Sequence, residues 1–252
     1  MTTPPASHLQ VGRVVNFTVR LIRVNRLPLL ALSAIVAVPS VILAYQDAAF
    51  PDADLWDLPV ALPFAAYFIA AAFVTATITR MIVPDSAGHY PSFAGSIQAV
   101  LNDVFAVATI GVVTSALVMA GFLFLIVPGL ILGVLLAVPI PVRTIEHSGL
   151  VQSCVRSAVL TKGNRWPIFG LFVAVIVLEV VGDVAVNIVM GDPVFAGFTE
   201  DARSNNALAI IASALIATAV SVISATGTAV LYCELRRIKD GPAPRELASE
   251  FD

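Results

Sequence analysis

The sequence predicts an all-α polytopic membrane protein with six transmembrane helices, and two observations lead to that fold class. Of the 252 residues, 58% are hydrophobic and only 12% are charged, with a mean hydropathy of +0.93. A soluble domain carries about 25% charged residues, so most of this surface does not face water. The apolar residues also form continuous runs, whereas the strands of a transmembrane barrel alternate apolar and polar residues over about ten positions.

Six apolar runs are the predicted membrane spans, since about 20 residues at 1.5 Å each cross ~30 Å of hydrocarbon. They cover residues 27–45, 58–83, 104–127, 130–142, 166–190 and 207–233. The first run is expected to remain in the protein as a membrane span, because it lacks the flanking features of a signal peptide that is cleaved off. The fourth is short, so it either begins below the outer surface or bends at Pro139. Pro128-Gly129 is predicted to be the turn between the third and fourth runs.

Three amphipathic segments, residues 10–25, 91–103 and 148–161, each precede an apolar run. In the first of them, arginines recur at helical spacing on one face, and apolar side chains cover much of the remainder. Such a helix is typical of a membrane interface, with its apolar side down and its arginines toward anionic headgroups. The candidate headgroup contacts in the chain are Arg13, Arg20, Arg23, Arg156, Lys162 and Arg165.

The distribution of Lys and Arg predicts the orientation of the spans, because cytoplasmic loops carry an excess of these residues. One side would hold Arg13, Arg20, Arg23, Arg26, Arg80, Arg143, Arg156, Lys162, Arg165, Arg236, Arg237, Lys239 and Arg245, which leaves only Arg203 of the 14 opposite. Both termini are therefore expected in the cytoplasm. The predicted organisation is a tail and amphipathic helix (1–26), a six-span domain (27–235) and a basic tail (236–252).

A short sequence match points to an internal repeat. Residues 25–29 (Asn-Arg-Leu-Pro-Leu) resemble residues 164–168 (Asn-Arg-Trp-Pro-Ile), and both lie between an amphipathic segment and an apolar run. With residues 91–103 as a degenerate middle copy, the chain divides into three units of surface helix and membrane hairpin. The alternative is that interface helices end in Asn, Arg and Pro for local reasons.

A set of residues in the second half of the chain resembles a known family. The set comprises Pro128-Gly129, Leu132, Pro139, Glu146, Ser157, Leu160-Thr161-Lys162-Gly163, Arg165-Trp166, Phe169-Gly170 and the closing Leu231-Tyr232-Cys233-Glu234-Leu235-Arg236. It is similar to the membrane domain found beside glycerophosphoryl diester phosphodiesterases, a family that also includes stand-alone bacterial inner-membrane proteins. The resemblance implies a six-helix bacterial membrane protein. It does not imply catalysis, because that chemistry belongs to a separate soluble domain.

No catalytic set is recognisable in the sequence. His8, His89 and His147 lack paired carboxylates at metal-ligand spacing, and there is no phosphate-binding loop, nucleophile elbow or zinc-peptidase motif. Cys154 and Cys233 are both expected on the cytoplasmic side, where thiols stay reduced. The sequence therefore predicts a protein that is not an enzyme and that holds no metal or cofactor.

Three polar residues in the fifth run form the candidate buried polar site. Glu179, Asp183 and Asn187 follow one another at intervals of four residues, which places them on one helix face. Glu179 would lie about 20 Å into the membrane, where a charged carboxylate costs ~2.5–3.5 kcal/mol on insertion scales. Either these residues form a cation or proton site, or a protonated Glu179 bonds to hydroxyls of the sixth run and assists helix packing, while Asp183 and Asn187 reach water at the outer face.

Two functions follow from these patterns. The first is a non-catalytic role in the cell envelope, in which the protein binds membrane lipids, a membrane-protein partner or a second copy of itself, and no nucleic acid. The alternative is transport of a solute, ion or proton through the buried acids of the fifth run. A membrane-embedded enzyme of lipid metabolism is the weakest reading, because clustered acids, bases or metal ligands are missing.

Overall fold

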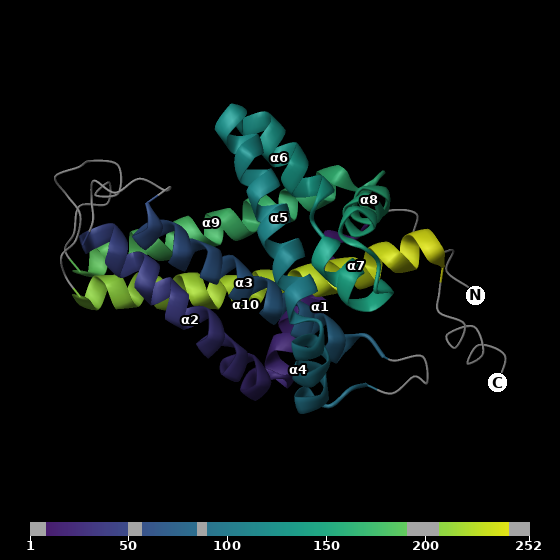
Figure 1. Ribbon diagram of the computed structural model, residues 1–252, viewed down its shortest axis with the longest axis horizontal. Coiled ribbons are helices and arrows are strands. Elements are labelled where there is room, and N and C mark those ends of the chain that lie inside the picture. Colours follow the sequence, from purple (N-terminus) through teal and green to yellow (C-terminus); the bar gives the residue numbers. More distant parts are fainter. Residues whose placement is uncertain (1–8, 50–56, 85–89, 191–206, 242–252) are drawn as a thin grey trace.

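Four long helices form the body of the protein. The computed structural model describes residues 9–49, 57–84, 90–190 and 207–241, which contain ten α-helices and no strand. The helices α2 (Arg26–Ala49), α3 (Leu58–Ile82), α9 (Arg165–Met190) and α10 (Ala207–Asp240) extend along the long axis of the molecule (Figure 1). α10 packs against the other three. Fully buried Leu32, Val36 and Ala229 belong to the core where α2, α3 and α10 meet.

The predicted fold class is confirmed. Six helical segments of the described chain are long and apolar enough to cross a membrane. Many of their apolar side chains lie on the outside of the protein, as in the fifth segment, where only 6% of an 18-residue apolar stretch is buried within the chain. A surface of this kind is stable in hydrocarbon and unstable in water, so the chain is a multi-pass integral membrane protein.

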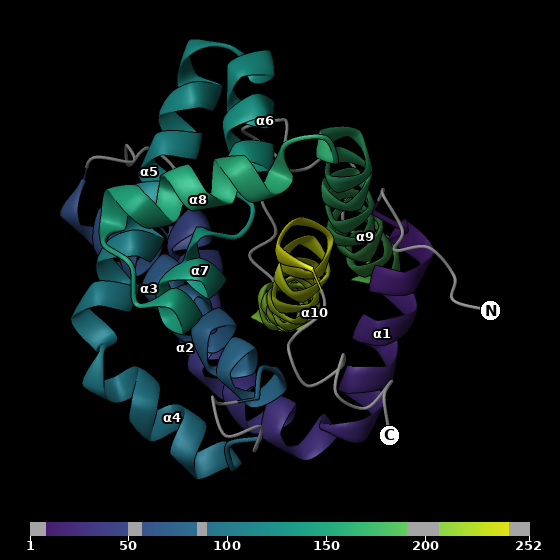
Figure 2. The same cartoon turned by 90° about the vertical axis from the view of Figure 1, so that its right-hand side faces the viewer.

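Short helices gather at one end of the long ones. The helices α1 (Val11–Val24), α4 (Phe93–Asn102) and α8 (Leu150–Thr161) run across the direction of α9 and α10, which Figure 2 shows end-on. Arginines of α1, α8 and the last turns of α10 also lie at this end, which we call the basic end. The predicted amphipathic segments are therefore helices that lie across the direction of α9 and α10. Their place at a membrane surface stays a prediction.

The three junctions between short and long helices are alike. Asn25 separates α1 from α2, Asp103 separates α4 from α5 (Val104–Phe124), and Asn164 immediately precedes α9. Asn25 closes its helix locally, because its backbone N–H and its side-chain amide both donate to the carbonyl of Leu21. The order of elements follows the predicted plan of surface helix and apolar helix. The threefold repeat itself stays a prediction.

The turn between the third and fourth apolar segments lies at Leu125, so its prediction at Pro128-Gly129 was wrong. Leu125 is extended (φ −167°, ψ 150°) and joins α5 to α6 (Ile126–Leu135). Pro128 lies in the first turn of α6, where a missing N–H removes no helical hydrogen bond. A side chain at Gly129 would place its Cβ 2.5 Å from the ring of Phe122. The Pro-Gly pair thus lies in the first turn of α6, and its glycine lets α6 pack closely on α5.

The fourth apolar segment is broken before Pro139, so of the two alternatives for this segment the structure shows a bend. α6 ends at Leu135 and α7 (Pro139–Glu146) begins at the proline. With ten residues, α6 is about 15 Å long and cannot cross ~30 Å of hydrocarbon alone. The hairpin of α5 and α6 stands across the long helices in both views (Figures 1 and 2). The six apolar segments are therefore not six parallel rods.

A buried serine satisfies the backbone at this break. Ser157 of α8 is fully buried, and its Oγ donates to the carbonyl of Leu135 (2.8 Å) and accepts the N–H of Val138 (3.2 Å). The Leu135 carbonyl would bond to residue 139 in a continuous helix, but proline has no N–H to offer. Ser157 replaces that bond, and it anchors α8 on the break between α6 and α7.

Candidate functional site

The predicted polar site on α9 faces hydroxyl groups of two neighbouring helices. The Ser213 hydroxyl of α10 is close enough to the Asp183 carboxylate to donate to it. Glu179 lies near both Asp183 and Tyr67 of α3, and Tyr67 in turn interacts with Ser221 of α10. Among the described residues, no Lys or Arg forms an ion pair with either acid. The structure therefore brings the two acids together with hydroxyls of α3 and α10. Within the chain Glu179 and Asn187 are half-buried and Asp183 is exposed, so the three residues are not enclosed by the neighbouring helices.

The helices α9 and α10 are in close contact at Gly182. A Cβ built there would lie 2.6 Å from Cγ2 of Ile216 on α10, so only glycine fits without a shift. Small residues at such crossings let membrane helices approach closely. Close packing then stabilises their association in lipid, where the hydrophobic effect does not drive it. Gly182 therefore fixes the α9–α10 contact beside the acids, and from there the helices continue toward the basic end.

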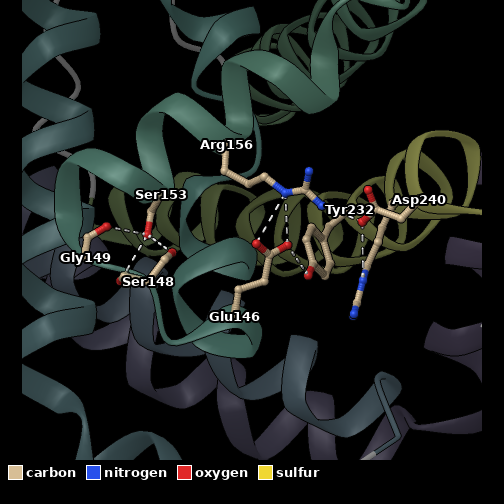
Figure 3. A network of polar contacts seen from close by, with 8 residues as sticks. Glu146, Ser148, Gly149, Ser153, Arg156, Tyr232 and Asp240 are labelled. Atoms are coloured by element: carbon tan, nitrogen blue, oxygen red, sulfur yellow. Dashed lines mark hydrogen bonds and ion pairs between the residues drawn. The ribbon is translucent and has the colours of Figure 1, made fainter.

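A polar network at the basic end joins α7, α8 and α10 (Figure 3). Arg156 of α8 pairs with Glu146 of α7 (Nε to Oε2, 3.3 Å) and with Asp240 at the end of α10. The hydroxyl of Tyr232 donates to the other oxygen of Glu146 (3.2 Å). Burial alone would lower the pKa of Arg156, but Glu146 and Asp240 outweigh it and raise the pKa. The network therefore holds α7, α8 and α10 together around the Arg156 guanidinium, which is paired with two carboxylates.

This network changes the interpretation of one candidate lipid contact. Arg156 was expected to meet headgroups, yet its guanidinium is engaged by two carboxylates of the chain. Glu146 and Asp240 were not foreseen as its partners, because they lie 10 and 84 residues away in sequence and share no local pattern with it. Only the folding of α10 back onto α7 and α8 brings the three together.

The remaining candidate headgroup contacts divide into two groups. Arg13 lies near Glu234 of α10 (3.9 Å), which also pairs with Arg237 (3.2 Å). The second group comprises Arg20, Arg23, Lys162 and Arg165, whose side chains are exposed. None of these four forms an ion pair with another described residue. These four positive charges are available to an anion outside the chain.

His147 connects three elements of the basic end. It ends α7 in a left-handed conformation (φ 50°), which is uncommon for a residue with a side chain. Its Nε2 lies 3.1 Å from a guanidinium nitrogen of Arg80, and its Nδ1 lies 3.6 Å from Asp103. Because the arginine can only donate, Nε2 accepts and Nδ1 carries the proton in this arrangement. His8 and His89 lie outside the described residues.

No group of three or more metal-ligating side chains gathers in the described part of the chain. Its two cysteines are unpaired. Burial raises the pKa of the Cys154 thiol, which leaves less of the reactive thiolate at neutral pH. Cys154 is therefore a weaker nucleophile than a fully exposed cysteine.

The start of α1 is fixed to the start of α9 by one buried hydrogen bond. The backbone N–H of Leu9 donates to Oδ1 of Asn164 (2.8 Å), and both residues are almost fully buried. The bond links positions 155 residues apart in sequence. The Asn-Arg-x-Pro motif at residues 164–167 therefore does more than end a surface helix, because its asparagine also holds the N-terminal segment in place.

A cavity of about 390 Å³ lies between α1, α9 and α10. Its walls are apolar apart from the hydroxyls of Thr18, Ser224 and Thr228. The sequence does not indicate it, because every lining residue also fits an ordinary packing surface. The residues on its walls are Val14, Val15, Thr18, Val19, Ile22, Ala137, Ile168, Leu171, Phe172, Ala174, Val175, Leu178, Ile223, Ser224, Gly227, Thr228 and Leu231.

Comparisons with known protein families, with curated proteins and with solved structures found no match for this chain. The geometry of the basic end, the polar cluster and the cavity is therefore the basis for the function proposed below.

Proposed function

We propose that this chain is a non-catalytic protein of the bacterial inner membrane whose basic end binds anionic phospholipids from the cytoplasmic side. The observation that carries the proposal is the placement of α1. This helix lies across α9 and α10 (Figure 2), its Val14 and Thr18 are buried against the protein, and its Arg20 and Arg23 are exposed. An interfacial helix is expected to present an apolar side to the membrane and a basic side to headgroups.

Charge counting supports the same orientation. A basic residue near an anionic membrane surface contributes about 1 kcal/mol of attraction. Arg20 and Arg23 of α1, with Lys162 and Arg165 at the α8–α9 junction, are exposed and unmatched by described acids. Both termini would then lie in the cytoplasm, because Lys and Arg concentrate on that side of membrane proteins.

Replacing Arg13, Arg20 and Arg23 together by glutamine is expected to weaken the preference for anionic lipid. At about 1 kcal/mol per residue, loss of these charges reduces the preference for phosphatidylglycerol over phosphatidylethanolamine by tenfold or more. Native mass spectrometry of the purified protein in mixed lipid measures that ratio. Arg203→Gln is the control, because Arg203 is the one basic residue predicted on the opposite side. An unchanged ratio in the triple variant would contradict the proposal.

Transport through the polar cluster is the second candidate function. The observation that favours it is the pair of acids on α9, which lie beside hydroxyls of α3 and α10 and have no basic partner among the described residues. Acids inside a membrane protein often mark an ion or proton pathway. If Glu179 carries a proton or cation, Glu179→Gln abolishes uptake of that ion into proteoliposomes, while Asn187→Ala, about two turns further along the same face, retains most of it. Equal proton and sodium flux in wild-type and Glu179→Gln proteoliposomes would eliminate this role.

A further inference from the structure

The cavity lies between the basic end and Gly182, where α9 contacts Ile216 of α10. Its walls are α1, which lies across the long helices, residues 168–178 of α9 and residues 223–231 of α10. The resulting volume of about 390 Å³ is within the range of ~300–1,000 Å³ typical of small-molecule sites.

The walls of the cavity suit a hydrocarbon chain. No charged side chain lines it, and the α9 side of the wall extends over about three turns, from Ile168 to Leu178. The hydroxyl of Thr18 donates to the carbonyl of Val14 (2.8 Å) within its own helix, so it requires no polar ligand. The cavity also borders apolar segments that cross the membrane, where the surrounding medium is lipid.

We propose that this cavity holds one acyl chain of a phospholipid from the leaflet at the basic end, with α1 lying over the chain. This inference rests on the proposed function and names the site at which the lipid is held. Charge complementarity favours a phospholipid over a neutral apolar molecule. The face of α1 that lines the cavity carries Val15, Val19 and Ile22, and the arginines of α1 occupy its other side, where a headgroup phosphate lies.

The helix α1 is held in place on both sides of the cavity. At its start, Leu9 bonds to Asn164 and Arg13 lies near Glu234. At its end, Asn25 leads directly into α2, which packs against α10. A chain beneath a fixed helix exchanges more slowly than the lipids that surround the protein, so one phospholipid should remain bound through delipidation.

Filling the cavity tests the proposal. Val175→Phe adds a ring to the cavity wall on α9, and Gly227→Leu adds a side chain on α10, where a Cβ would meet only Thr18 Oγ1 at 4.0 Å. Val177→Phe is the matched control, because Val177 is 52% exposed on another face of the same helix and does not line the cavity. The probe is phosphatidylglycerol with a photoreactive diazirine in one acyl chain, in nanodiscs, and cross-linked peptides are mapped by mass spectrometry.

The proposal predicts cross-links concentrated on α1, on residues 168–178 and on residues 223–231 in the wild type and in Val177→Phe. Val175→Phe and Gly227→Leu should each lower that labelling at least fivefold and remove the lipid retained after delipidation. Labelling spread evenly over all lipid-facing helices, or unchanged in both filled variants, would overturn the proposal. Even labelling together with an intact preference for anionic lipid would leave the proposed function standing and place the lipid at the surface arginines.

Discussion

Replacing Ser157 by alanine is expected to lower the thermal stability of the protein more than any other single removal of a hydroxyl at the basic end. The change leaves the Leu135 carbonyl and the Val138 N–H without their partner in a buried site. Each buried polar group left unpaired costs about 1–3 kcal/mol, and Pro139 cannot supply the missing helical bond. The melting temperature in detergent, followed by circular dichroism, measures the loss.

Ser153→Ala is the matched control for this prediction. Ser153 is also fully buried in α8, but its Oγ bonds within its own turn, to Ser148 and to the carbonyl of Gly149. That carbonyl keeps the N–H of Ser153 when the hydroxyl is removed. The alanine variant at 153 should therefore unfold closer to the wild type. If the two variants melt together, Ser157 does not support the break between α6 and α7.

Replacing Gly182 by leucine is expected to destabilise the α9–α10 contact by about 1–3 kcal/mol, the usual range for an overpacked site. Its Cβ would lie 2.6 Å from Ile216 Cγ2, and the rest of the side chain has to displace α10 as well. The displacement also separates Asp183 from Ser213. Thermal unfolding in detergent, with and without added lipid, measures the effect.

Gly170→Leu provides the comparison on the same helix. A Cβ at Gly170 has nothing within 4 Å, so a leucine side chain there enters open space. Leucine is also a better helix former than glycine, by up to about 1 kcal/mol. The variant at 170 is expected to equal or exceed the wild type in stability. Equal losses of stability in the two variants would mean that replacing a glycine of α9 is itself destabilising. The contact with Ile216 would then not be the cause.

The fold class and most helices were predictable because the membrane imposes a strong compositional constraint. A segment such as residues 166–190 has to be apolar over some 20 positions to cross the hydrocarbon, and its helix covers Arg165–Met190. The break at Pro139 was also predictable, since proline cannot continue a helix without losing a hydrogen bond. Constraints of this kind act within one segment, so they can be recognised from the sequence of that segment alone.

The turn at Leu125 was mispredicted for a physical reason that local patterns do not reveal. Pro-Gly is typical of a turn, yet proline is equally well tolerated in the first turn of a helix. The close contact between Gly129 and Phe122 decides between the two, and it depends on how α5 and α6 pack. The crosswise hairpin likewise follows from packing between helices, which the hydropathy of residues 104–142 does not specify.

The candidate site was predictable only in part. The spacing of Glu179, Asp183 and Asn187 placed them on one helix face, and hydroxyls of the sixth run were expected as partners for Glu179. In the structure it is Asp183 that lies beside such a hydroxyl, that of Ser213. The network of Glu146, Arg156 and Asp240 and the cavity beneath α1 were not predictable. Both depend on contacts between segments distant in sequence, which local patterns do not specify.

The most direct test of the account is the structure of the protein in nanodiscs that contain phosphatidylglycerol, determined by electron cryo-microscopy with a bound antibody fragment. The account predicts density for one acyl chain between α1, α9 and Gly227 of α10, with its phosphate near Arg20 or Arg23. A cavity closed by movement of α1 onto α9, with α1 lifted from the lipid headgroups, would contradict it.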